Sequence, residues 1–172
     1  VAVGSVANWI DRGQLRAGRT PGGHRRVPIP ELIAFLRRQK LPIPAELRAA
    51  APKVLFVDDE AEVVDLLARE VKEAHPECEP LKAHDGFTAG EIVGAERPEV
   101  VVLDIYMEGL DGLQVCRRIK AREETRHTVV IAITGHHSPE VQEQALEAGA
   151  VACLPKPVDM PALLPLIEDA IG

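Results

Sequence analysis

Four short apolar runs in the sequence are each followed directly by polar residues that could do chemistry. These are Asp58 and Asp59 after Val54–Val57, Asp104 after Val100–Leu103, Thr134 after Val129–Ile133, and Lys156 after Ala150–Leu154 and Pro155. Short runs rich in β-branched residues are typical of strands buried on both faces of a parallel sheet. Ligands of such sheets bind beyond the carboxyl ends of the strands. For Asp104 alone, the competing interpretation is a cap of the following turn.

The residue types in this set favour phosphoryl transfer onto Asp104. Three carboxylates held together repel one another and require a cation, and oxygen ligands with open water positions suit Mg²⁺. A hydroxyl such as that of Thr134 can donate to an anion, and the ammonium of Lys156 can offset its charge. An aspartyl-phosphate is an established form of covalent catalysis, so Asp104 is the predicted nucleophile.

The elements that must position these residues alternate between strand and helix from Lys53 onward. Helical patterns are expected at residues 61–74 and 86–93, after the cap Asp111, from Ser138 to Gly149, and toward Ile171. Such alternation predicts an α/β fold with a five-stranded parallel, doubly wound sheet of flavodoxin-like order 2-1-3-4-5. That order makes the first and third strands neighbours. Because proline is disfavoured inside helices, we expect the last helix to begin late or to kink near Pro165.

Charge divides the 172-residue chain into two parts. Residues 1–50 carry nine Lys and Arg against three Asp and Glu, a net charge of +6, whereas residues 51–172 carry eleven against twenty-four, a net charge of −13. The division predicts two modules, the basic one suited to a polyanion. Three widely spaced cysteines argue against a disulfide framework, and no apolar run is long enough for a membrane span, so a cytoplasmic protein is expected.

The basic module is predicted as a helix, a short hairpin and a second helix. The first helix covers residues 1–11, the turn Pro21-Gly22-Gly23 closes the hairpin, and the second helix runs from Pro30 to about Gln39. A helix beside a basic hairpin suits duplex DNA, while the alternative is a solvated basic face. We therefore expect a module at residues 1–39, a Pro/Ala-rich linker at 40–52 and a second domain at 53–172.

Residues 53–172 resemble the receiver domain of two-component response regulators. The resemblance rests on "VLFVDDE", "VVVLDIYMEGLDG", "AITG" and "LPKP". It implies that Asp104 accepts phosphate from a histidine kinase or phosphotransfer protein. It also implies a Mg²⁺ site in which Asp59, Asp104 and the backbone carbonyl of Tyr106 ligate the ion and Asp58 acts through water. Thr134 and Lys156 are expected to contact the phosphoryl group. The peptide bond between Lys156 and Pro157 is expected to be cis.

Residues 1–38 resemble the excisionase-like and MerR-like winged helix-turn-helix family, chiefly through "RTPGGHRR". That resemblance implies DNA contacts from the first helix and from the basic hairpin, with Trp9 in the core. The implied contact residues are Gly4, Ser5, Asn8, Arg16, Arg19, His24, Arg25 and Arg26. The family has a further helix upstream, so this module is expected to be truncated.

The leading hypothesis is a transcriptional regulator whose DNA-binding output is controlled by phosphorylation of Asp104. The alternative is an adaptor or phosphate sink that acts through protein contacts without DNA, and homodimerisation is open in either case. A Mg²⁺-dependent phosphatase is a third, weaker hypothesis, because Tyr106 stands where a second acidic residue is needed. We therefore expect no enzyme activity beyond autophosphorylation and autodephosphorylation. Cys153 occupies the position where receivers often carry a switch aromatic, so an aromatic rotamer switch is not expected.

Overall fold

The computed structural model describes most of the chain and divides it into two compact units, Val1–Ala50 and Ala51–Ile171. The described residues are 3–15, 17–19, 25–27, 29–39, 41, 51–107 and 110–171. The predicted linker at 40–52 lies almost wholly outside these residues. Each unit is considered by itself below.

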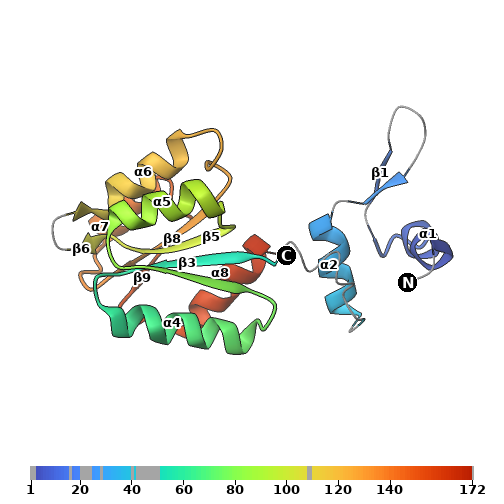
Figure 1. Cartoon of the computed structure of the whole chain (residues 1–172), viewed down its shortest axis with the longest axis horizontal. Helices are drawn as coiled ribbons and strands as arrows, with labels where there is room; N and C mark the ends of the chain where they lie inside the picture. The colour runs from blue at the N-terminus through green and yellow to red at the C-terminus, as the bar shows by residue number, and fades with distance from the viewer. Residues whose placement is uncertain are drawn as a thin grey trace. The chain divides into compact units, whose positions relative to one another are not determined.

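The first unit contains two helices and a two-stranded hairpin (Figure 1). Its elements are α1 (Val3–Asp11), β1 (Gly18–Arg19), β2 (Arg25–Arg26) and α2 (Ile29–Arg38). The two strands pair antiparallel. The rings of Trp9 and Phe35 lie 4.8 Å apart between centroids, and Leu15 and Leu36 are buried. The predicted sequence of elements is therefore present, and Trp9 packs against the second helix as expected.

The second unit is a five-stranded parallel sheet with helices on both faces (Figure 1). Its strands are β3 (Lys53–Val57), β4 (Glu79–Ala83), β5 (Val100–Asp104), β8 (Val129–Thr134) and β9 (Ala152–Pro155). Its helices are α4 (Ala61–Ala74), α5 (Gly86–Glu96), α6 (Gly112–Ala121), α7 (Pro139–Glu147) and α8 (Met160–Ile171). The strand order β4-β3-β5-β8-β9 is 2-1-3-4-5 when these strands are counted along the chain, as predicted.

Alternation along each central strand separates the apolar side chains into two cores. Leu55, Val57, Val101 and Leu103 pack on one face beneath α5, α6 and α7. The neighbouring side chains of the same strands, such as Phe56 and Val102, pack on the other face beneath α4 and α8. Because both faces are covered, β5 is buried along its whole length, which explains its unbroken run of apolar residues.

Local caps fix where the helices begin. Asp85 accepts a hydrogen bond from the backbone N–H of Thr88 at 2.8 Å, and Ser138 accepts one from Val141 at 3.3 Å. Asp111 accepts from Leu113 at 2.9 Å, which confirms it as the cap of α6. Side-chain oxygens that accept from the first turn satisfy N–H groups without a helical partner.

The path of the chain differs from the sequence prediction at two places. The last helix is expected to begin late or to kink near Pro165, and the late start is wrong, because α8 starts at Met160 and includes Pro165. Pro165 is exposed, whereas Leu163 and Ile167 are completely buried against the sheet, and this packing outweighs the one lost hydrogen bond. The segment after Asp104 contains a hairpin of β6 (Tyr106–Met107) and β7 (Leu110–Asp111) that the sequence did not predict.

Candidate functional site: an acidic pocket at the carboxyl edge of the sheet

Asp104 ends the central strand β5 and is held there by its own backbone environment. The residue is only 3% exposed. Oδ1 accepts a hydrogen bond from the backbone N–H of Tyr106 at 2.9 Å, which fixes the rotation of the carboxylate. A carboxylate buried at a strand end, with one oxygen orienting it, is consistent with a role as a nucleophile.

Asp58 and Asp59 lie beside Asp104 because β3 and β5 are neighbours in the sheet. Asp58 is 1% exposed, and its Oδ1 accepts from the backbone N–H of Glu60 at 2.9 Å, whereas Asp59 is exposed. One oxygen from each of the three carboxylates can be chosen so that all lie within 4.8 Å of one another. The prediction that these three acids form one cluster is confirmed.

Lys156 follows the edge strand β9, and its side chain extends into this cluster. Its Nζ lies 2.7 Å from Oδ2 of Asp104 and 2.6 Å from Oδ2 of Asp58. The backbone holds the residue in place, because its N–H donates to the carbonyl of Thr134 at 2.8 Å. The peptide bond to Pro157 is cis, as predicted. Lys156 thus connects the carboxylates of two strands that are not adjacent to its own strand.

Burial and hydrogen bonding shift the pKa values of Asp58 and Lys156 in opposite directions. Burial raises the pKa of Asp58 above its ordinary value, and the hydrogen bond from Lys156 only partly offsets this effect. Burial also tends to lower the pKa of Lys156, but the hydrogen bonds to Asp104 and Asp58 outweigh it, so the pKa of the ammonium is raised. Lys156 is therefore a permanent cation at neutral pH.

The charge balance of the cluster fits a divalent cation. Three carboxylates and one ammonium leave about two negative charges within a few ångströms, in a partly buried site. Oxygen-only ligands with one exposed member, Asp59, suit a hard ion that retains several waters, which is the coordination Mg²⁺ prefers. The residues present therefore fit the predicted cofactor.

Thr134 and its surroundings form the other rim of the pocket. The Thr134 side chain is completely buried, and its Oγ1 accepts a hydrogen bond from the backbone N–H of His136 at 3.0 Å. The rings of Tyr106 and His136 meet edge to face with centroids 6.0 Å apart. The hydroxyl of Thr134 thus has a backbone partner here and makes no hydrogen bond to Asp104.

Two residues at the site were not identified from the sequence. Oε1 of Glu60 lies 3.4 Å from Nζ of Lys156, and its position directly after Asp58 and Asp59 could have indicated this. Gly112 is the second. A Cβ there would lie 2.4 Å from the carbonyl oxygen of Asp104 and 2.6 Å from the Cα of Ile105. Only glycine allows α6 to begin this close to Asp104.

Cys153 lies within the core under α5, α6 and α7 and is 5% exposed. Burial raises the pKa of its thiol. The position therefore holds a small, buried thiol in place of the aromatic side chain that receivers often carry there.

The structure describes only some of the residues that were predicted to contact DNA. Gly4, Ser5 and Asn8 lie in α1, and Asn8 is exposed. Arg19, Arg25 and Arg26 lie in the paired strands β1 and β2. Arg16 and His24 lie outside the described residues. The helix and the hairpin that were predicted to carry the contacts are present, and nothing about the contacts themselves follows from this.

Fold and pocket together define a flavodoxin-like α/β domain with an acidic site at the carboxyl edge of its sheet. A family model described as the response regulator receiver domain matches residues 54–168, so the chain belongs to the response regulator receiver family. The match covers the whole pocket. It does not include the first unit.

Curated relatives and solved structures agree with this assignment. The chain is 38% identical over 107 residues to the response regulator PleD of Caulobacter vibrioides, covering 62% of this chain and 23% of PleD. It is 35% identical over 112 residues to the response regulator MprA of Mycobacterium ulcerans, covering 65% of this chain and 47% of MprA. The chain thus spans less than half the length of either relative.

Among solved structures, one is the signal receiver domain of a DNA-binding response regulator (merR) from Colwellia psychrerythraea 34H. It is 30% identical with a TM-score of 0.67, over 70% of this chain and 98% of that one. A response regulator receiver protein from Pseudomonas putida is 28% identical with a TM-score of 0.64, over 70% and 98% of the two chains. Among the helices that the structure describes, none combines the length and the apolar character needed to cross a bilayer.

Proposed function

We propose that Asp104 is the phosphoacceptor of this receiver and that its phosphorylation controls a DNA-binding output of the first unit. The observation that carries the first part is the contact of 2.7 Å between Lys156 Nζ and Asp104 Oδ2, inside a cluster of three carboxylates. The same ammonium also lies 2.6 Å from Oδ2 of the buried Asp58, so Lys156 joins the carboxylates at the ends of β3 and β5.

The proposed reaction transfers a phosphoryl group from a phosphohistidine of a kinase or phosphotransfer protein. A carboxylate oxygen of Asp104 attacks phosphorus, the P–N bond breaks, and its electron pair stays on the imidazole nitrogen. The N–H of Tyr106 holds the carboxylate in orientation while the reaction proceeds. Lys156 remains close to the developing charge, and the hydroxyl of Thr134, which accepts from the backbone N–H of His136, donates its own proton to a phosphoryl oxygen.

Asp59, Asp104 and the carbonyl of Tyr106 would hold Mg²⁺, with Asp58 acting through water, and the bound ion would supply positive charge to the phosphoryl oxygens. Without it, two negative charges of the cluster oppose the approach of an anion. The chain is proposed to catalyse only its own phosphorylation and dephosphorylation and to act in the cytoplasm.

The test is phosphorylation by a small phosphodonor such as acetyl phosphate, with and without Mg²⁺, measured by intact-protein mass. Wild type should gain one phosphoryl group only with Mg²⁺, and Asp104→Asn should gain none. Lys156→Met should lose at least about tenfold in rate, since a contact to a transferring anion is removed. Phosphorylation that persists in Asp104→Asn would show that another residue is the acceptor.

The DNA-binding output is supported by the helix and basic hairpin of the first unit and by the net charge of +6 in residues 1–50. It also agrees with the name of the Colwellia protein, which describes a DNA-binding response regulator. Titration with duplex DNA at several salt concentrations separates the two components of binding. A sequence preference that persists when the salt-dependent part is subtracted supports this output. Purely salt-dependent binding, equal for all sequences, would favour the adaptor or phosphate sink.

A further inference from the structure

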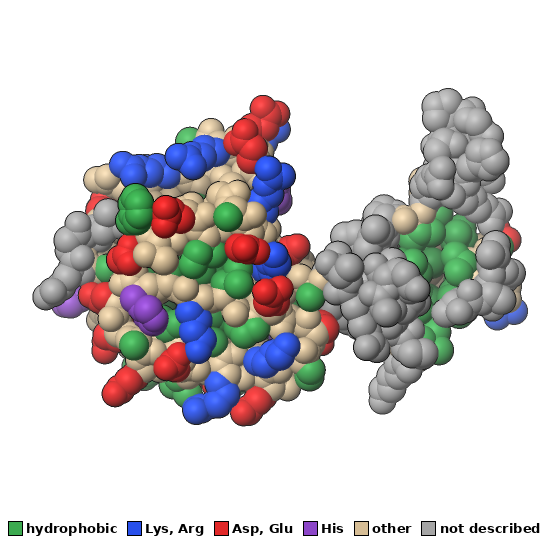
Figure 2. Space-filling model, viewed as in Figure 1, with side chains coloured by type: hydrophobic (Ala, Val, Ile, Leu, Met, Phe, Trp, Pro, Cys, Tyr) green, Lys and Arg blue, Asp and Glu red, His purple; other side chains and the backbone are tan. Residues whose placement is uncertain are grey.

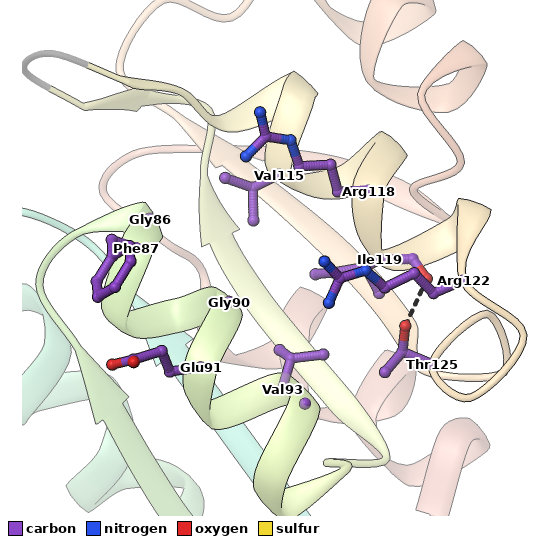
Figure 3. Close-up of a pocket in the computed structure, with 11 residues that line it drawn as sticks. Gly86, Phe87, Gly90, Glu91, Val93, Val115, Arg118, Ile119, Arg122 and Thr125 are labelled. Carbon is purple, nitrogen blue, oxygen red and sulfur yellow. Dashed lines mark hydrogen bonds between the residues drawn. The ribbon is translucent and has the colours of Figure 1, made fainter.

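A groove between α5 and α6 lies outside the acidic pocket and shares no residue with it. It encloses about 540 Å³ and is lined by two neighbouring helices (Figure 3). Val93, Val115 and Ile119 supply apolar side chains, while Phe87 and Glu91 stand on α5 and Arg118 and Arg122 on α6 and just after it. We propose that this groove is the interface through which two copies of this chain form a symmetric dimer.

The depth of the groove comes from two glycines that the single chain does not need. An added Cβ at Gly90 or Gly94 would meet no atom within 4 Å. Glycine inside a helix is less favourable than alanine by roughly 0.5–1 kcal/mol, and here no close contact within the described chain requires it. A second surface that packs closely against α5 would explain why these two positions carry glycine.

An exposed aromatic side chain stands beside the groove. Phe87 is 75% exposed, the largest exposure among the large apolar side chains that the structure describes. Its position within the lining of the groove puts an anchor and a receiving cavity on the same surface. Aromatic side chains and arginine are the residue types enriched at the energetic centres of protein interfaces.

The charges of the two helices are complementary to each other. Apart from Glu96, which pairs with Lys53, the charge of α5 is that of Glu91, whereas α6 carries Arg117, Arg118 and Lys120 and no acidic residue. Figure 2 shows Lys and Arg side chains gathered along the edge where α6 lies. Among the described residues, none forms an ion pair with Glu91, Arg118 or Arg122. A groove with one acidic and one basic wall, both unpaired, is the pattern of a self-complementary surface.

Two-fold symmetry would satisfy both walls at once. As successive crossover helices of a parallel sheet, α5 and α6 run in the same direction. A two-fold axis along the groove places α5 of each protomer on α6 of its partner, so that Glu91 faces the partner's Arg118 and Arg122 twice. Each Phe87 then packs over the groove of the other protomer. Such an interface is isologous, with every contact made twice.

The test is sedimentation velocity of the full chain between about 1 and 500 μM, the range of moderate affinities. Wild type should show concentration-dependent dimerisation, and Phe87→Asp should raise the dimer Kd at least about tenfold. Leu146→Asp is the matched control, because Leu146 is an exposed leucine (45%) outside the groove and its replacement should leave the Kd unchanged.

Charge reversal makes the test specific to the proposed pairing. Glu91→Arg alone should weaken dimerisation by about tenfold, and so should the double variant Arg118→Glu/Arg122→Glu. An equimolar mixture of these two chains should dimerise again, because each chain then supplies the charge that the other requires. Gly94→Ala should raise Tm by about 3 °C yet weaken the dimer, two effects of opposite sign.

The proposal is overturned if wild type stays monomeric, or if it dimerises equally well with Phe87→Asp and with the charge-reversed chains. In either case the groove would not be an interface between two copies of this chain. Because Asp104→Asn does not touch the groove, it should dimerise like the wild type. Failure of the phosphorylation proposal and failure of this one are therefore distinguishable.

Discussion

The two units of the chain hold their polar groups in different ways. In Ala51–Ile171, the functional groups are buried at strand ends, where Asp58 and Asp104 are nearly inaccessible and are held by backbone N–H groups. In Val1–Ala50, the basic residues of the hairpin stand on a small scaffold whose core includes Trp9, Leu15, Phe35 and Leu36. The proposed phosphorylation requires groups held at fixed positions by a rigid sheet, whereas the proposed contact with DNA requires only a scaffold that carries positive charge.

The largest effects are expected from removing the central aromatic side chain of either unit. Phe35→Ala should destabilise the first unit by about 3 kcal/mol, and Phe56→Ala the second by about 3 kcal/mol, since each side chain is 1% exposed. The chain carries its own reporters, because the single tryptophan, Trp9, is in the first unit and all three cysteines are in the second. Tryptophan fluorescence should therefore respond to Phe35→Ala alone, and thiol labelling to Phe56→Ala alone. Simultaneous loss of both signals would show that the units unfold together.

A slightly smaller effect is expected at the contact between α6 and Asp104. Gly112→Ala places a Cβ against the backbone of Asp104 and Ile105, so the unfolding free energy should fall by about 2 kcal/mol. The rate of phosphorylation by acetyl phosphate should fall with it, because the carboxylate is displaced. Gly135→Ala is the matched control, since a Cβ at Gly135 meets nothing within 4 Å. Equal behaviour of the two variants would refute the idea that backbone packing positions the acceptor.

The charge balance of the pocket predicts that Mg²⁺ reverses the effect of Asp58→Asn on the stability of the chain. Without Mg²⁺, Asp58→Asn should stabilise the chain by on the order of 1 kcal/mol, because burial raises the pKa of Asp58 and its charge is unfavourable there. With Mg²⁺ in excess, the wild type should gain stability that the variant does not. The measurement is Tm with Mg²⁺ and with EDTA. A wild type indifferent to Mg²⁺ would contradict the proposed cation site.

The smallest signal is expected from the thiols of the native protein. Burial raises the pKa of Cys116 to about 11, and Cys78 and Cys153 are also buried. Iodoacetamide at pH 8 should therefore label none of the three in the folded chain and all three after denaturation. Labelling of the native wild type would mean that the second unit opens more readily than its packing indicates, and the contrast between the units would lose its physical basis.

Much of the site followed from the sequence, because each predicted residue stands directly after a buried strand. Periodicity and strand length identified β3, β5 and β8, and the parallel topology then required their carboxyl ends to meet at one edge. Asp58, Asp59, Asp104 and Lys156 were grouped on that ground, and the structure brings them together. The resemblance to receivers supplied their proposed roles.

Other features could not be predicted in the same way, because they depend on distances between segments that are far apart in the chain. The need for glycine at position 112 arises from how closely α6 approaches the end of β5. The continuity of α8 through Pro165 reflects burial on the sheet, which overrides the local preference of proline. Gly90 and Gly94 face open space in the groove between α5 and α6, and no pattern in the sequence distinguishes such a position from a crowded one.

By itself, the sequence determined the alternation of the five sheet strands with helices and the residues that share the carboxyl edge of the sheet. These features depend on local hydrophobic pattern and on the right-handed crossover rule. Tertiary structure alone decided that Lys156 bridges Asp58 and Asp104, that Glu60 joins them, and that two oppositely charged helix faces border one groove. The physical reason is that charge and packing act over a few ångströms, and only the folded chain sets distances on that scale.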